Sequence, residues 1–414
     1  MSQSIQSELA ELRATPLFRR LREIETPQQP AMEFAGRKLV NFSSNDYLGL
    51  ATEPALREAA RAAIEQYGVG AGASRLVCGT LSPHMRLEEC LAAFKQTEAA
   101  LTFSSGYAAA LGVLDALCGK EDVIILDKLC HASLIDGAKL SGAVVRVFPH
   151  NHLGRLESHL KWAAENYPAG RVLVVTESVF SMDGDWALLP EIIEMKDRHG
   201  ALLLLDEAHA VGVIGAHGRG LADQLGLSSR VDIHFGTLSK ALGVSGGYVC
   251  GSRALIELLI NRARSFIYST APPAALAAAA TASLEFLMSA AGERRRQVLR
   301  GNLAQLAAEL PELFPESKKV ESAIVPVILG AAETALAASH WLCEQGLFVA
   351  AIRYPTVARE AARLRVTLSA AHTERQIHDL CASLSKVLAR GAIASEPKRP
   401  PWIASQGKAG GGRA

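Results

Sequence analysis

Short apolar runs alternate with longer amphipathic segments through the middle of the chain. Runs of ~4–8 apolar residues without alternation are typical of strands that are covered on both faces of a sheet. The segment 190–199 is typical of a helix, because it begins with Pro, carries acids early and bases late, and precedes Gly200. Strand, helix and strand in repetition predict a parallel sheet with right-handed crossovers. The predicted strands are residues 122–127, 144–148, 171–176, 201–206 and 231–235.

After Tyr248 the pattern changes to long helices and then to a weaker mixture of strands and helices. We therefore expect an α/β protein with a large domain of mostly parallel sheet, residues 46–288, and a smaller C-terminal α+β domain, residues 289–390. Residues 1–45 are expected to be an N-terminal segment, and the composition of residues 391–414 is typical of a disordered tail. The predicted later helices are residues 272–290, 293–309, 333–345 and 374–389, and the predicted later strands are residues 323–329 and 364–368.

Composition narrows the class of protein. The 414 residues include 43 Lys and Arg against 42 Asp and Glu, so the formal charge of +1 favours neither a nucleic-acid nor a membrane-surface partner. No run approaches the ~18 apolar residues of a membrane-spanning helix, and the charged first twenty residues are untypical of a secretory signal. We expect a soluble cytoplasmic protein. The seven cysteines form no C-x-x-C pair, so neither a disulfide framework nor a metal site is predicted.

Two acids and a histidine follow four consecutive leucines. Asp206, Glu207 and His209 therefore lie at the carboxyl end of a buried strand, where parallel sheets bind ligands. The same string resembles the acidic box of nucleic-acid helicases, which also requires a phosphate loop of the form G-x-x-x-x-G-K-[ST] upstream. The upstream Gly119-Lys120 pair lacks the first glycine and the Ser or Thr of that loop, so the helicase interpretation is disfavoured.

A lysine follows the next predicted strand. Lys240 lies among Gly, Thr and Ser residues in the segment 235–243, although a lone lysine of this kind is more often a solvated surface residue. Together with Asp206 and His209 it forms the set that pyridoxal phosphate needs, namely an amine for a Schiff base and a carboxylate for the ring nitrogen. Asp206 would keep that nitrogen protonated, and His209 would reach the phenolic oxygen.

Further candidates follow other predicted strands. His131 comes shortly after the strand that ends at Asp127, and its imidazole would stack on the cofactor ring, although structural packing also explains it. Residues 103–108 are typical of a strand, a Ser/Gly turn and a helix start, which would bind an anion through backbone N–H groups. A helix cap explains that segment equally well. Ser181 and Thr237 add hydroxyl groups at two more strand ends.

Four motifs in this order resemble those of the α-oxoamine synthases, which are pyridoxal-phosphate enzymes of the aspartate aminotransferase fold. The resemblance covers about nine tenths of the chain, from Arg19 to Val387, and the joint set is far more specific than any single motif. The motifs are residues 41–49 (NFSSNDYLG), 131–133 (HAS), 206–209 (DEAH) and 237–240 (TLSK).

This resemblance implies roles for individual residues. Lys240 would carry the cofactor, pyridoxal 5'-phosphate, as a Schiff base, with Asp206 at the ring nitrogen, His209 at the ring oxygen and His131 stacked on the ring. The segment 268–270 would reach the phosphate in a neighbouring subunit, which implies a homodimer with its active site at the interface. The other implied cofactor contacts are Gly106, Tyr107, Ser181, Thr237, Ser269 and Thr270, and the implied substrate contacts are Arg19, Asn45, His131, Thr356 and Arg365.

The segment 351–357 looks most like the branch of the family that condenses L-alanine with a pimeloyl thioester in biotin synthesis. The thioester carrier, coenzyme A or acyl carrier protein, stays open. Tyr354 replaces the Pro that is usual in that branch, and Tyr354-Pro355 also occurs in the branch that joins glycine to acetyl-CoA and in the aminolevulinate branch. The alternatives among enzymes are therefore the glycine acetyltransferase branch or another α-oxoamine synthase. From another class, a catalytically inactive binding protein of the same fold is the remaining alternative.

Overall fold

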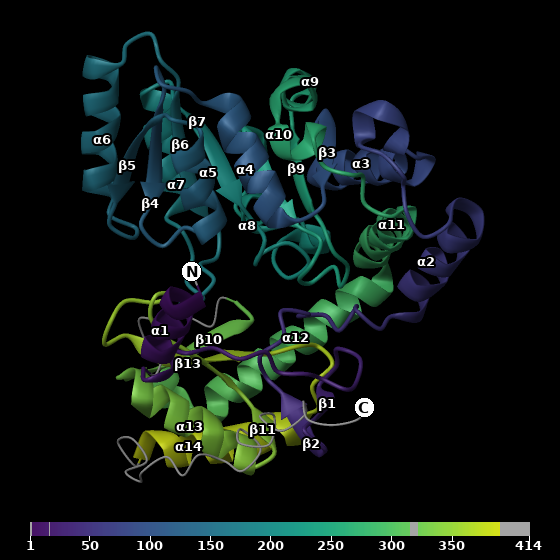
Figure 1. Cartoon of the computed structure of the whole chain (residues 1–414), viewed down its shortest axis with the longest axis vertical. Helices are drawn as coiled ribbons and strands as arrows, with labels where there is room; N and C mark the ends of the chain where they lie inside the picture. The colour runs from purple at the N-terminus through teal and green to yellow at the C-terminus, as the bar shows by residue number, and fades with distance from the viewer. Residues whose placement is uncertain (1, 16, 315–321, 390–414) are drawn as a thin grey trace. The chain divides into compact units, whose positions relative to one another are not determined.

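The computed structural model describes residues 2–15, 17–314 and 322–389 (Figure 1). The chain divides into two compact units. Among the described residues, the large unit comprises 45–300 and 322–323, and the small unit comprises 2–15, 17–44, 301–314 and 324–389. The predicted tail, residues 391–414, lies outside the described residues.

A seven-stranded sheet forms the centre of the large unit (Figure 1). Its strand order is β3-β9-β8-β7-β6-β4-β5, and the neighbours from β8 to β5 pair in parallel, whereas β9 is antiparallel to both β3 and β8. The predicted α/β class with a mostly parallel sheet is confirmed. The strands are β3 (Ala99–Phe103), β4 (Val123–Asp127), β5 (Val144–Phe148), β6 (Val172–Glu177), β7 (Leu202–Asp206), β8 (Ile233–Thr237) and β9 (Gly247–Gly251).

The helices of the large unit connect and cover these strands. Those between β3 and β8 follow the strand–helix–strand alternation that the sequence predicts, and α7 agrees within a residue at each end with the predicted helix 190–199. The helices are α2 (Pro54–Tyr67), α3 (Ser82–Lys95), α4 (Gly106–Leu117), α5 (Ala132–Leu140), α6 (Leu153–Asn166), α7 (Leu189–Arg198), α8 (Leu221–Gln224), α9 (Arg253–Arg262), α10 (Arg264–Ile267), α11 (Ala274–Met288) and α12 (Ala290–Glu309), the last of which continues into the small unit.

The sheet separates two hydrophobic cores. Ile124 and Leu126 of β4 pack into one core with α4, α5, α9 and α10, whereas Val123 and Ile125 pack into the other with α6, α7 and α8. Successive side chains of a strand point to opposite faces, so a strand covered on both faces must be apolar at every position. Each fully buried aliphatic side chain contributes about 1.5–3 kcal/mol. This double burial explains the unbroken apolar runs in the sequence.

Helix α11 is rich in alanine and packs against α2 and α3. Small side chains allow such close approach of helix backbones. Across the described residues, no single helix has the length and apolar character needed to cross a membrane; the bent pair α11 and α12, which meet at 74°, meets these criteria only as a pair.

The small unit combines the first and last parts of the described chain. One sheet has the order β1-β2-β11, with β11 parallel to β2, and the other has the antiparallel order β10-β13-β12. The N-terminal strands thus share a sheet with a strand from the C-terminal half. The elements are α1 (Ser2–Arg13), β1 (Ala31–Phe34), β2 (Arg37–Asn41), β10 (Ile324–Gly330), α13 (Ala332–Glu344), β11 (Leu347–Phe348), β12 (Ala350–Ile352), β13 (Ala362–Thr367) and α14 (Glu374–Ala389).

A buried histidine holds the two ends of the small unit together. His372 stacks on Phe42 with ring centroids 4.3 Å apart. Its Nε2–H donates to the Asn41 carbonyl at 2.9 Å, and its Nδ1 accepts from the Ser369 N–H at 2.9 Å. This neutral tautomer satisfies both ring nitrogens. Burial lowers the pKa of His372 from its ordinary value of 6.5 to about 4.

His372 makes the stability of the protein depend on pH. Because its pKa is lower in the folded state, the unfolded chain binds the proton first, and stability falls as the pH drops from about 6.5 to about 4. At ~1.4 kcal/mol per pKa unit, the loss is a few kcal/mol. We expect His372→Gln to flatten the dependence of urea-unfolding free energy on pH over this range. An unchanged slope in the variant contradicts this assignment.

Candidate active site

Lys240 begins a chain of hydrogen bonds that ends at the start of the large unit. Its Nζ lies 2.7 Å from His209 Nε2, and His209 Nδ1 lies 2.6 Å from the Tyr47 hydroxyl. The Tyr47 hydroxyl in turn donates to Asn45 Oδ1 at 3.1 Å. The four groups are satisfied when His209 carries its hydrogen on Nδ1 and accepts from the lysine at Nε2. The structure therefore brings together three sequence-predicted residues and adds Tyr47.

Asp206 is the last residue of β7 and is 6% exposed. Its Oδ1 accepts from the Ala208 N–H at 2.9 Å. Burial raises the pKa of Asp206, and the positive charge of Lys240 opposes that rise. A buried carboxylate in this position is stabilised by a cation beside it, because charge pairing compensates for lost hydration.

Sequence reasoning missed a second carboxylate at this edge. Glu177 ends β6, is directly opposite Asp206 in the parallel register and is 2% exposed. Burial, followed by the negative charge of Asp206, raises the pKa of Glu177. Its Oε1 has no hydrogen-bond partner within the part of the chain that the structure describes. A single Glu at the end of a predicted strand carries no distinctive signal, and only the strand register places it beside Asp206.

His131 is the N-cap residue of α5. Its Nδ1 accepts from the Ser133 N–H at 3.3 Å and lies 2.8 Å from the Ser133 hydroxyl. Burial and the nearby charge of Lys240 lower the pKa of His131. The imidazole is therefore neutral at physiological pH, and it lies near enough to Lys240 to respond to its charge.

The predicted anion site lies where the loops after β3 and β8 meet. Ser105 caps α4, with its hydroxyl accepting from the Ala108 N–H at 3.0 Å. A Cβ atom on Gly106 would lie 3.5 Å from the Thr237 side chain, so these two residues are neighbours. Thr237 Oγ1 donates to the Gly246 carbonyl at 2.7 Å. A helix N-terminus with free N–H groups and a hydroxyl beside it attracts a phosphate.

The other predicted cofactor contacts of the large unit are Ser181, Tyr107, Ser269 and Thr270. Ser181 is buried in the loop after β6, and its backbone N–H lies beside the Glu177 carboxylate. The Tyr107 hydroxyl donates to Asp136 Oδ2 at 2.5 Å, which leaves its backbone as the group available to a phosphate. Ser269 and Thr270 follow α10.

Three predicted substrate contacts belong to the small unit. Arg365 lies on β13, is 6% exposed and pairs in register with Pro326 of β10 and Ala350 of β12. Thr356 and Arg19 are exposed.

Arg19 belongs to a group of positive charges in the small unit. Arg353 donates from Nη2 to the Phe18 carbonyl at 3.0 Å. Burial, and then the charges of Arg19 and Arg22, lower the pKa of Arg353. Such crowding of like charges favours the binding of an anion.

The residues of the large unit fit pyridoxal 5'-phosphate. They offer an amine at Lys240, a buried carboxylate at Asp206, a neutral imidazole at His131 and a helix N-terminus at Gly106. Within the described residues Glu177 Oε1 is buried without a hydrogen-bond partner, so this site has an acceptor that a bound polar ligand would satisfy. An aromatic cation with an aldehyde and a phosphate matches this combination of groups.

Comparison with known proteins also indicates a pyridoxal-phosphate enzyme of this family. The family described as "Aminotransferase class I and II" matches residues 37–384. The 8-amino-7-oxononanoate synthase of Geobacter sulfurreducens is 46% identical over 94% of this chain and 98% of that protein. The enzyme of the same name from Anaeromyxobacter dehalogenans is 49% identical over 93% of this chain and 95% of that protein.

Solved structures extend the comparison to the fold. Serine palmitoyltransferase from S. paucimobilis, with a bound PLP–myriocin aldimine, superposes with a TM-score of 0.87 and 31% identity over 94% of this chain and 97% of that one. The 8-amino-7-oxononanoate synthase of Francisella tularensis gives 0.72 and 31% over 85% and 98%. The chain therefore belongs to the class I and II aminotransferase family, and its resemblance to the α-oxoamine synthases within that family is confirmed.

Proposed function

We propose that the chain is an 8-amino-7-oxononanoate synthase that acts as a cytoplasmic homodimer. The reaction joins the α-carbon of L-alanine to the acyl carbon of a pimeloyl thioester, with release of the free thiol and of the alanine carboxylate as CO2. The observation that carries the proposal is the Lys240–His209 contact of 2.7 Å beside buried Asp206, in a chain 46% identical to a synthase of this name.

Pyridoxal 5'-phosphate, when bound, supplies an electron sink that stabilises negative charge on the α-carbon of the amino acid. Asp206 holds a proton on the heterocyclic nitrogen, because a buried carboxylate strongly favours a cation at hydrogen-bond distance. His209 orients both Lys240 and the ring oxygen, and Tyr47 fixes the His209 tautomer. Thr237 and the N-terminus of α4 bind the phosphate.

Lys240 has two roles in this proposal. Its amino group would hold the cofactor covalently, and Nζ would also serve as the base for the α-proton of alanine and as the acid that returns a proton to the product. His209 Nε2 accepts a hydrogen bond from Nζ, so it holds the amino group in place within the site. His131, whose pKa is lowered by desolvation and by Lys240, would stack on the ring without adding a charge.

The substrate contacts are those that the family resemblance implies. Arg365 binds the carboxylate of L-alanine through its planar guanidinium group. Asn45 and Thr356 line the amino-acid site, and Arg19 binds the acyl substrate. The arginines around Phe18 favour a negatively charged thioester, which suits pimeloyl groups on coenzyme A or on acyl carrier protein.

Exposed apolar side chains of the large unit support the proposed homodimer. Leu76, Val77 and Tyr268 expose 53%, 78% and 72% of their surface. An isolated bridge between Ser74 and Thr270 joins the two segments that carry them. Large apolar side chains gathered in this way favour burial against a second copy, in which Ser269 and Thr270 would contact the partner's phosphate.

Reconstitution tests the covalent role of Lys240. Protein incubated with pyridoxal 5'-phosphate and freed of excess is expected to be yellow, and borohydride is expected to bleach the band and fix the cofactor on the peptide that contains residue 240. Lys240→Ala should lack the band and lose at least ~100-fold in kcat, because it lacks both the link and the base. Lys139→Ala, at an exposed lysine of α5, is the matched control. A colourless, folded wild type overturns the proposal.

Asp206→Asn tests the charge at the ring nitrogen. The amide cannot pair with a cationic nitrogen, so kcat is expected to fall by at least ~100-fold, while Asp115→Asn on α4 leaves it unchanged. Circular dichroism and the cofactor absorbance confirm that both variants are folded and loaded. Normal turnover in loaded Asp206→Asn contradicts the assigned role.

The choice of substrate decides between branches of the family. Pimeloyl-CoA or pimeloyl-acyl carrier protein with L-alanine should release CO2 and thiol, whereas glycine with acetyl-CoA should release neither above background. Product mass identifies the condensation. Efficient condensation of glycine with acetyl-CoA instead identifies the acetyltransferase branch.

A further inference from the structure

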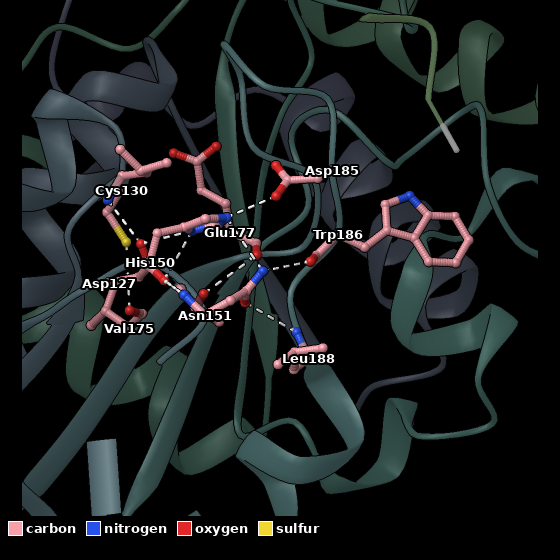
Figure 2. A network of polar contacts seen from close by, with 11 residues as sticks. Asp127, Cys130, His150, Asn151, Val175, Glu177, Asp185, Trp186 and Leu188 are labelled. Atoms are coloured by element: carbon pink, nitrogen blue, oxygen red, sulfur yellow. Dashed lines mark hydrogen bonds and ion pairs between the residues drawn. The ribbon is translucent and has the colours of Figure 1, made fainter. Parts of the chain in front are cut away.

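Three loops of the large unit meet at His150, in a network of polar contacts that sequence reasoning did not predict (Figure 2). His150 follows β5. Its Nδ1 lies 3.2 Å from both carboxylate oxygens of Asp127, the last residue of β4. Its Nε2 lies 2.8 Å from Asp185 Oδ2, in the loop after β6. One imidazole thus joins carboxylates from two different loops.

The geometry requires a charged ring. Each nitrogen of His150 faces a carboxylate, and only the imidazolium form donates from both nitrogens. Burial alone would lower the pKa of His150, but its hydrogen bonds to Asp127 and Asp185 outweigh burial and raise the pKa to about 10. The Asp127 carboxylate is 1% exposed, so the imidazolium offsets part of the cost of its burial. Asp185 Oδ1 has no partner among the described residues, so its hydrogen bond to His150 is made through Oδ2 alone.

Neighbouring hydrogen bonds extend the link along the same loops. The Asp127 carboxylate also accepts from the backbone N–H groups of Leu129 at 2.8 Å and Asn151 at 3.0 Å. The Asn151 side chain donates to the Trp186 carbonyl at 2.9 Å and accepts from the Leu188 N–H at 3.2 Å. His150 and Asn151 together therefore fasten the loop after β4 to the loop after β6.

These two loops carry cofactor residues of the proposed function. The loop after β4 leads to His131, and the loop after β6 contains Ser181. The backbone N–H groups of both residues lie beside the Glu177 carboxylate. The distance between the loops therefore sets the position of His131 relative to Ser181. His150, Asp127 and Asp185 themselves have no role in the proposed chemistry.

We propose that His150 is a positioning residue, whose cation ties Asp127 to Asp185 and so holds the loops bearing His131 and Ser181 at the spacing that bound pyridoxal phosphate requires. The inference rests on the proposed cofactor site. The positioning role of His150 affects affinity for the cofactor and does not depend on which amino acid or acyl substrate the protein uses. Its test therefore uses cofactor binding rather than turnover.

The test compares dissociation constants for pyridoxal 5'-phosphate, measured by titrating cofactor-free full-length protein. His150→Gln keeps the approximate size of the side chain but has no charge, and its dissociation constant should rise at least tenfold. His150→Arg retains a cation with several N–H donors and should recover part of the loss. His152→Gln, in the same loop but exposed and without a carboxylate contact, should bind as the wild type does.

The dependence on pH separates this role from general destabilisation. The charged groups that face His150 are Asp127 and Asp185, and Glu177 lies at the end of the adjacent strand. The Phe180 ring packs edge-on against the imidazole, with the two ring centroids 4.3 Å apart. As the pH approaches 10, the wild type loses the imidazolium and its advantage over His150→Gln should vanish. His150→Arg should keep its advantage there, because arginine stays charged.

Asp185→Asn keeps the proposal testable if His150→Gln does not fold. This variant leaves the contact with Asp127 intact, and a several-fold rise in the dissociation constant is expected. Wild-type affinity in either folded variant, or equal loss in His150→Gln and His150→Arg at neutral pH, overturns the positioning role. A wild type that binds the cofactor but does not condense alanine with the thioester refutes the proposed function alone.

Discussion

Three adjacent parallel strands each end in a buried carboxylate. Burying these charges is energetically unfavourable, and the groups placed around them to offset that cost make up the site. Asp127, Glu177 and Asp206 are the last residues of β4, β6 and β7, which are neighbours in the sheet. Burial makes a lone carboxylate unfavourable, and neighbouring carboxylates raise each other's pKa. The structure offsets the cost of burial differently at each carboxylate. These differences distinguish Asp127, which has a structural role, from Glu177 and Asp206, which lie in the candidate active site.

Asp127 is fully compensated by His150 and two backbone N–H groups. Asp206 has one backbone N–H and the charge of Lys240, and Glu177 retains an oxygen without a partner within the described chain. Glu177 and Asp206 are therefore less fully compensated than Asp127. In the proposed function, a cationic cofactor bound at this edge would supply the positive charge that Glu177 and Asp206 lack.

Glu207 shows how a neighbouring acid can have an entirely structural role. Burial would raise its pKa, but Lys95 outweighs burial and lowers the pKa to about 2. Glu207 accepts from Lys95 Nζ at 2.5 Å and from the Ala222 N–H at 3.1 Å. Glu207, one of the two acids in the string that resembles the helicase box, thus holds the loop after β7 in place. Two consecutive acids have different roles because adjacent residues leave a strand in opposite directions.

The sequence by itself determined the parallel sheet, its strand positions and the Lys240–Asp206–His209 set, because buried strands are apolar at every position and chemistry lies at their carboxyl ends. It did not predict β9, whose five residues include two glycines and which becomes a strand only by pairing with β3 and β8. Only the tertiary structure decided the partners Tyr47, Glu177 and His150. Tyr47 and His209 are 162 residues apart, and such contacts depend on strand register and loop packing, which no local pattern encodes.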